Sequence, residues 1–325
     1  MHRTPHSPAL APPALAFARW GIAAAIVLGS VAALFALGRF WSAKFYRTSG
    51  EAQWLWSHHR IAADEPEAFY LRRDFDLPPA RAFVRIRVAA DPGFTLWFNG
   101  VEVGGQASDG RTLFSYDVSA WARDQGNRIV LAARSPRGVG GVLATVDLGP
   151  LKQNWLSTDE SWHLHSDWSP SLLEPSARAS LGRAPRILGR PPIGRWNYPE
   201  ERTVEPYPAE WTRVDPQRSV RYRSWLPKIE KKSGVIVAGR RTAEAIAFDF
   251  GHVEGRAAIR VAPGPKRAIV HGYASAPHQL AEPGLIEHFV VGEGEGEVVS
   301  PESRAFRYLV VYDEDVEAWV VGERR

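Results

Sequence analysis

The sequence predicts an all-β protein in which two β-sandwich domains follow a single N-terminal transmembrane helix. Short segments with an apolar residue at every second position recur along most of the chain. Turn residues separate them about every 8–12 positions, as in β-sandwiches. The 325 residues include 28 glycines and 25 prolines, which favour turns over long helices, and 45% apolar residues, which suffice for buried cores. One long apolar segment lies near the N-terminus.

This apolar segment is Trp20–Gly38, which carries no charge and lies between Arg19 and Arg39. About 20 such residues span a bilayer as a helix. A cleaved signal peptide has a shorter apolar region, about 7–15 residues, followed by a small-x-small site, and no good site precedes Lys44. We therefore predict a single-pass signal anchor. Residues 1–19 are then a cytoplasmic N-terminus, residues 39–66 a juxtamembrane segment, and the bulk of the chain is periplasmic or extracellular.

Charge and cysteine content exclude several classes of function. The formal net charge is only +4, and basic residues are interspersed with acidic ones, so no nucleic-acid-binding surface is indicated. The chain has no cysteine. Disulfides, thiolate metal sites and a lipoprotein anchor are therefore excluded.

The first predicted sandwich covers residues 67–168. Within Ala82–Ala89, the residues Val84, Ile86 and Val88 fall on one face of a strand and are expected to be buried. The strongest local signal is Asn99-Gly100, because this pair accepts the positive φ angles of a type I′ hairpin turn. Strands are expected at Leu71–Asp76, Phe94–Phe98, Val101–Val103, Arg128–Ala133 and Val142–Leu148.

The rest of the chain divides into a connector and a second sandwich. Residues 169–227 are rich in proline and arginine, and proline at this density blocks helix interiors and central strands. We interpret this tract as a connector that lies over the domain surfaces. Alternating patterns resume in residues 228–325, which we assign to the second β-sandwich.

Several segments resemble a known protein family. The first domain contains, in order, FTLWFNGVEVG, YDVSAW, GNRIVLAA and TDESW, and the second contains FDFGHVEGRAAIRV, IVHGYAS and RAFRYLVV. These resemble the galactose-binding-like and jelly-roll sandwiches of bacterial α-L-rhamnosidases and related glycoside hydrolases. In those enzymes the sandwiches are non-catalytic and accompany a helical catalytic barrel. The resemblance implies sandwich modules without the barrel.

A glycosidase needs two carboxylates about 5–9.5 Å apart. In the resembled enzymes these acids belong to the barrel, so no catalytic residue is assigned here. Asp159 in TDESW and Asp249 in FDFG are expected to accept backbone hydrogen bonds in turns. The other candidates are Asp74 with Asp76, Glu160, Glu254 and Asp313 to Asp315.

Metal and cofactor sites are not indicated. His58 with His59, and His163 with His165, are the close histidine pairs, and neither has an evident third ligand. We predict surface histidines, no metal and no cofactor.

Sugar binding requires an aromatic platform with polar side chains beside it. Trp162 is expected to be buried, because tryptophans mostly complete cores. Trp155 and Trp168 lie in polar surroundings and are expected to be exposed. The predicted carbohydrate-binding residues are Trp155, Trp168, Asn154, His163 and His165.

The combined features predict a membrane-anchored, extracytoplasmic carbohydrate-binding or accessory protein without catalysis of its own. The expected partners are a polysaccharide or glycoconjugate, or a membrane-associated protein complex. Two alternatives stay open. One is a structural or interaction subunit that docks on such a complex without binding sugar. The other is a glycosidase, or a glycosidase subunit completed by a separate chain.

Overall fold

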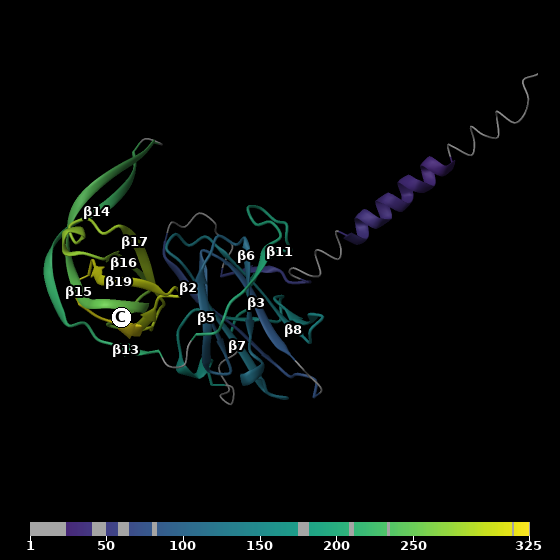
Figure 1. Cartoon of the computed structure of the whole chain (residues 1–325), viewed down its shortest axis with the longest axis horizontal. Helices are drawn as coiled ribbons and strands as arrows, with labels where there is room; N and C mark the ends of the chain where they lie inside the picture. Colours follow the sequence, from purple (N-terminus) through teal and green to yellow (C-terminus); the bar gives the residue numbers. More distant parts are fainter. Residues whose placement is uncertain are drawn as a thin grey trace, which may run out of the picture. The chain divides into compact units, whose positions relative to one another are not determined.

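The computed structural model describes residues 24–40, 50–57, 65–79, 83–174, 182–207, 211–232, 235–313 and 315–324. By its internal contacts the chain divides into two units, residues 1–47 and 48–325. In the first unit, residues 24–40 form a helix, purple in Figure 1, whose large apolar side chains are exposed. No helix among the described residues is long and apolar enough to cross a membrane. The predicted anchor Trp20–Gly38 begins outside these residues and stays a prediction.

The described part of the second unit is almost entirely β-structure. Its first sheet has the strand order β11-β1-β8-β3-β6-β12, with β9 paired to β8. The bounds are β1 Trp54–Trp56, β3 Val84–Asp91, β6 Thr112–Asp117, β8 Gly141–Leu148, β9 Gln153–Ser157, β11 Arg186–Gly189 and β12 Glu200–Thr203. All of these pairings are antiparallel except that of β12 with β6.

The second sheet has the order β10-β2-β7-β4-β5. The bounds are β2 Glu67–Phe75, β4 Gly93–Phe98, β5 Val101–Ala107, β7 Asn127–Ser135 and β10 His163–His165. Short 3₁₀ helices follow β6 and β10, at Ser119–Trp121 and Pro170–Leu172. Asn99 (φ 50°) and Gly100 (φ 86°) connect β4 to β5, which confirms the predicted hairpin turn.

These two sheets enclose one hydrophobic core. The predicted inward face of β3 is confirmed, since Val84, Ile86 and Val88 are buried among side chains from both sheets. Trp162 is also buried in this core, as expected. Burial of such apolar surface supplies most of the favourable free energy of folding.

Two segments form more structure than the sequence predicted. Trp54–Trp56, within the supposed juxtamembrane segment, forms β1, and Trp54 stacks on Trp196 at 4.7 Å. A Cβ at Gly141 would lie 2.9 Å from both of these rings, so glycine makes the close packing possible. The predicted connector 169–227 supplies β11, β12, β13 (Thr212–Val214) and the start of β14 (Arg218–Lys232). Its prolines are compatible with this because β11, β12 and β13 contain none and lie between them.

The third sheet has the order β13-β20-β15-β19-β16-β17, with β14 and β18 also paired to β15. The bounds are β13 Thr212–Val214, β14 Arg218–Lys232, β15 Val235–Val261, β16 Arg267–Ala274, β17 Leu285–Val291, β18 Glu297–Val299, β19 Arg304–Val311 and β20 Val316–Arg324. A 3₁₀ helix, Pro277–Gln279, lies between β16 and β17.

Where we predicted a second two-sheet sandwich, the structure has one continuous sheet folded around its own core. Strand β15 changes partners at an irregularity between Asp249 and Val253, where Gly251 has a φ of 74°. Before this bend β15 pairs with β14 and β19. After it, β15 keeps β19 as a partner as far as Gly255 and pairs with β20 and β18 in place of β14. Apolar residues from both halves, such as Phe248 and Ile259, therefore share one core.

Candidate functional site

The five predicted sugar-binding residues fall into separate places. Asn154 and Trp155 lie on β9, which pairs with β8 in the first sheet. Trp155 is the extra residue of a β-bulge, because Val146 pairs with Leu156 while Asp147 pairs with Asn154. The Trp155 side chain is 46% exposed, as expected, and its indole N–H donates to the Asp76 carbonyl at 2.9 Å. The Asn154 amide donates a hydrogen bond to the Asp147 carboxylate at 3.3 Å, so the Asn154 side chain has a structural role.

His163 and His165 lie on β10, at the edge of the second sheet. They pair with Arg72 and Tyr70 of β2, respectively. His165 is buried, contrary to a surface position, and burial lowers its pKa, with a further contribution from the Arg72 charge. A neutral, buried imidazole is a poor candidate for a surface sugar contact.

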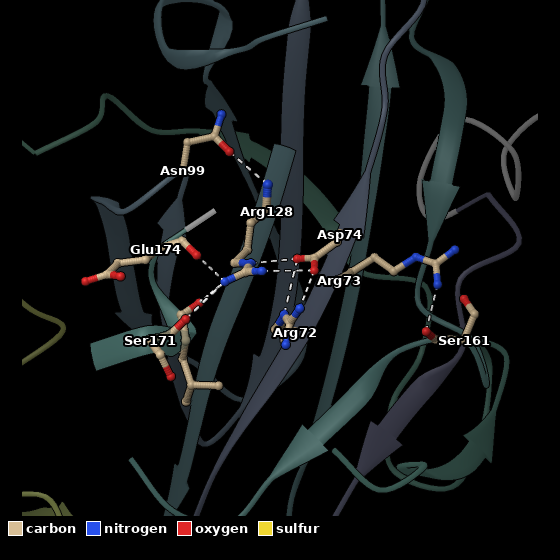
Figure 2. Close-up of polar contacts among 9 residues, drawn as sticks. Arg72, Arg73, Asp74, Asn99, Arg128, Ser161, Ser171 and Glu174 are labelled. Atoms are coloured by element: carbon tan, nitrogen blue, oxygen red, sulfur yellow. Dashed lines mark hydrogen bonds and ion pairs between the residues drawn. The ribbon is translucent and has the colours of Figure 1, made fainter. Parts of the chain in front are cut away.

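A charged network lies on the outer face of the second sheet (Figure 2). Arg128 on β7 donates to both carboxylate oxygens of Asp74 on β2, at 2.7 and 3.0 Å, and Arg72 also donates to this carboxylate. Although burial alone raises it, these hydrogen bonds hold the pKa of Asp74 below its usual value. Arg128 also donates to the carbonyls of Ser171 and Glu174.

This network fixes the segment that follows β10. Arg128 binds carbonyls at the end of the 3₁₀ helix Pro170–Leu172, and Leu172 packs with Tyr70 on the same face of the sheet. The largely buried Arg128 guanidinium therefore fixes this segment against the outer face of the second sheet. Its position in turn determines where Trp168 lies.

Trp168 lies in an aromatic group on this face, where it is partly buried and not exposed as predicted, because it packs against Tyr70 and Trp97. Its ring centroid is 5.2 Å from that of Tyr70 and 6.1 Å from that of Trp97 on β4. The backbone N–H of Trp168 donates to the carbonyl of Glu293 at 3.2 Å, which ties the segment to the loop between β17 and β18. Of the five predicted sugar-binding residues, Trp168 is thus the one that connects the second sheet to this loop.

A cleft of about 520 Å³ opens beside this group. Trp97 and Trp168 line one part of it, and β18 with the loop before it lines another. Its charged lining residues are Glu102, Arg134, Arg260, Glu295 and Glu297. Clefts with apolar walls and a few convergent polar groups are the usual form of small-ligand sites.

Arg134 and Glu295 join the two walls of this cleft. Their side chains form two hydrogen bonds, at 2.7 and 2.8 Å, and Arg134 also donates to the Val290 carbonyl at 2.8 Å. Burial disfavours the guanidinium charge, and the Glu295 carboxylate more than offsets this, so the pKa of Arg134 is raised. The bidentate pair is a fixed, charged element of the lining.

The other cleft carboxylates are also bound to arginines. Glu102 accepts a hydrogen bond from Arg256, and Glu297 accepts one from Arg260 at 3.2 Å. Tryptophan faces next to such oriented charged groups suit a sugar ring, whose C–H face packs on an aromatic ring while its hydroxyls bind charged side chains.

The other candidates have structural roles. Asp159 accepts the backbone N–H of Ser161 at 2.9 Å, and Asp249 accepts that of Gly251 at 3.1 Å, as expected for turn residues. The described ranges contain no group of histidine and carboxylate side chains able to hold a metal ion. His58 and His59 lie outside these ranges.

No protein-family model and no curated protein matches the sequence. Among solved structures, the GH78 rhamnosidase of Bacillus sp. GL1 is similar, with a TM-score of 0.53 and 12% identity over 83% of this chain and 55% of that one. The chain shares its fold with part of a rhamnosidase. The predicted resemblance is thus confirmed, and at this identity it concerns the fold alone. The chain spans about half the length of the Bacillus enzyme.

Two further matches are weaker. The α-L-rhamnosidase from Dictyoglumus thermophilum has a TM-score of 0.46 and 15% identity, covering 84% of this chain and 36% of that one. A lectin from Pleurotus ostreatus in complex with GalNAc has a TM-score of 0.40 and 14% identity, covering 84% and 74%.

Sequence reasoning missed most of the cleft. Trp97 could have been found, because Leu96 and Phe98 on either side of it are buried, which turns Trp97 to the outer face. The Arg134–Glu295 pair joins residues 161 positions apart, and no local signal indicates such a pairing.

Proposed function

We propose that this protein is a membrane-anchored, extracytoplasmic carbohydrate-binding or accessory protein with rhamnosidase-like modules and no catalysis of its own. The observation that carries the proposal is the cleft, in which Trp97 and Trp168 lie beside arginine–carboxylate pairs. The fold shared with part of a rhamnosidase supports a role in handling sugars.

The binding test is a glycan array probed with the purified full chain. We expect retention on at least one polysaccharide or glycoconjugate, and loss of it in Trp97→Ala and in Trp168→Ala. Trp225→Ala is the matched control, because Trp225 is 47% exposed and does not line the cleft. Trp155→Ala tests the other predicted platform in the same experiment. If both cleft variants are still retained on the array, the sugar-binding site lies outside the cleft. If the native chain is not retained on any glycan, sugar binding is refuted.

The anchor is part of the proposal. It is supported by the uncharged sequence of Trp20–Gly38 and by the exposed apolar side chains of helix 24–40. After alkaline washing of membranes the protein should stay in the pellet, and protease added to intact spheroplasts should digest its bulk. Release by the wash would contradict anchoring, and protection from protease would contradict the orientation.

A second candidate, docking without sugar binding, is favoured by one observation. Among the described strands β14 pairs only with β15, and it carries Val220 and Trp225, which are 53% and 47% exposed. On its other side the Trp225 N–H donates to the Ala281 carbonyl at 3.2 Å, which leaves the edge open around Val220. Exposed edges of this kind pair with other chains. Pull-down of the full chain from solubilised membranes tests this, with Val220→Lys expected to reduce capture of the partner and leave sugar binding unchanged.

A further inference from the structure

A second pocket adjoins the cleft, with which it shares Thr95, Arg134 and the Val298–Val299 segment, and lies between the start of β4 and strands β16 to β18. Its volume is about 270 Å³. Most of its wall is apolar, contributed by Pro92, Phe94, Pro136, Phe289, Val298 and Pro301. Its polar lining side chains include His271, Glu287, His288 and Glu302. A small apolar cavity with a few polar groups is suited to one small organic ligand.

His271 is the unusual member of this lining. Its residue is 2% exposed, and its ring stacks on Phe289 with centroids 3.9 Å apart. Neither ring nitrogen has a hydrogen-bond partner among the described residues, and the nearest Glu287 oxygen is 3.6 Å from Nε2, beyond hydrogen-bond range. Buried polar atoms in native proteins are nearly always satisfied. A bound ligand is one way to satisfy this imidazole.

The charges around the pocket do not balance. Glu287 and Glu302 both bind the same guanidinium, that of Arg304. Arg304 itself is outside the lining, and the lining cation, Arg134, is matched by Glu295. Burial lowers the pKa of both His271 and His288, so these imidazoles are neutral near pH 7. Two carboxylates against one arginine leave one negative charge at the pocket.

We propose that this pocket binds a small organic monocation, an ammonium group carried on an apolar, preferably aromatic, body. The ammonium compensates the excess charge and donates hydrogen bonds to Glu287, Glu302 and the acceptor nitrogen of His271. The apolar body packs against Phe94, Phe289 and the prolines, where aromatic rings also attract a cation. Anions are disfavoured by the carboxylates, and polyhydroxylated ligands by the apolar wall. The site is therefore distinct from a sugar site.

The test is a titration of the purified full chain with benzylammonium at pH 7, followed by saturation-transfer NMR and calorimetry. Benzyl alcohol and benzoate serve as the neutral and anionic isosteres. We expect benzylammonium to bind at least about 10-fold more tightly than benzyl alcohol, and benzoate not to bind. Equal affinity for the ammonium and the alcohol, or no binding of benzylammonium, overturns the proposal.

Two variants locate the binding. Glu302→Gln leaves Glu287 balanced by Arg304, so the preference for the ammonium over the alcohol should fall about 10-fold. Glu317→Gln removes a negative charge outside this pocket and should change nothing. Ala107→Leu places a larger side chain in the lining at an exposed position, where folding is not at risk, and should weaken both probes. Benzylammonium binding that is unchanged in both Glu302→Gln and Ala107→Leu refutes the assignment.

Discussion

The Arg134–Glu295 pair allows a specific prediction, because both groups are largely buried and the pair connects β7 to the loop between β17 and β18. The two side chains are 16% and 7% exposed. Breaking a buried pair by removing one partner leaves an uncompensated charge and costs about 3–5 kcal/mol. We therefore expect Arg134→Met and Glu295→Gln each to reduce the free energy of unfolding by this amount. The midpoint temperature should fall by roughly 2–4 °C per kcal/mol.

The double variant separates a charge effect from a packing effect. In Arg134→Met/Glu295→Gln neither charge is left alone, and the glutamine oxygen can still accept the Gly292 N–H that Glu295 accepts at 2.9 Å. The double variant should therefore be more stable than the sum of the single changes predicts, with a coupling of about 1–3 kcal/mol. Coupling of this size is expected of residues in contact or in one hydrogen-bond network, and not of distant, independent sites.

The assay is guanidinium unfolding of the full chain followed by tryptophan fluorescence. The probe is well placed, since Trp97 and Trp168 line the same cleft as Arg134. Glycan binding by the folded single variants should also be lost, because the pair joins the two walls. If Arg134→Met costs less than about 1 kcal/mol, as for an exposed ion pair, or if the two changes are additive, the reasoning about this pair is refuted.

Three further outcomes are expected. Asp147→Asn should cost about 3 kcal/mol in urea unfolding, because it removes the buried carboxylate 2.5 Å from the fully buried Arg87; a cost under about 1 kcal/mol would contradict this. Because burial lowers the pKa of His271 below its unfolded value near 6.5, the unfolded chain takes up the proton first. Stability should therefore be greatest above about pH 6.5 and fall as the pH drops toward 5, less steeply in His271→Phe; an equal slope would show that other groups dominate. Asn99→Ala should cost at least about 2 kcal/mol, since Asn99 has a φ of 50° and binds Trp121, Asn127 and Arg128. Asn99→Gly, which keeps the turn conformation, should cost less, and a reversed order would argue against the backbone contribution.

Much of the first pair of sheets was predictable, because the responsible signals are local. Val84, Ile86 and Val88 alternate with polar residues, and a strand has no other way to bury them together. Asn99-Gly100 specifies its turn through backbone preferences of the two residues alone. Of the candidate site, the exposure of Trp155 and the burial of Trp162 were also predicted correctly.

Other features were not foreseen, where distant contacts override local pattern. Trp54–Trp56 shows no alternation because all three residues are buried, and their strand depends on Trp196 far along the chain. The proline-rich connector contributes edge strands because the first sheet offers unpaired edges to it. His165 was expected at the surface and is buried beside Tyr70 and Arg72, since β10 pairs with β2.

The sequence by itself determined the β class, the turns and the inward faces of the first core, since each depends on residues within a few positions of one another. Tertiary structure alone decided the cleft and the pocket. Trp97 meets Trp168, Arg134 meets Glu295, and His271 comes to line a cavity with Phe94, only after strands from distant parts of the chain have packed. Charge balance and unmet hydrogen bonds, on which binding depends, are properties of that packed arrangement and have no counterpart in local sequence.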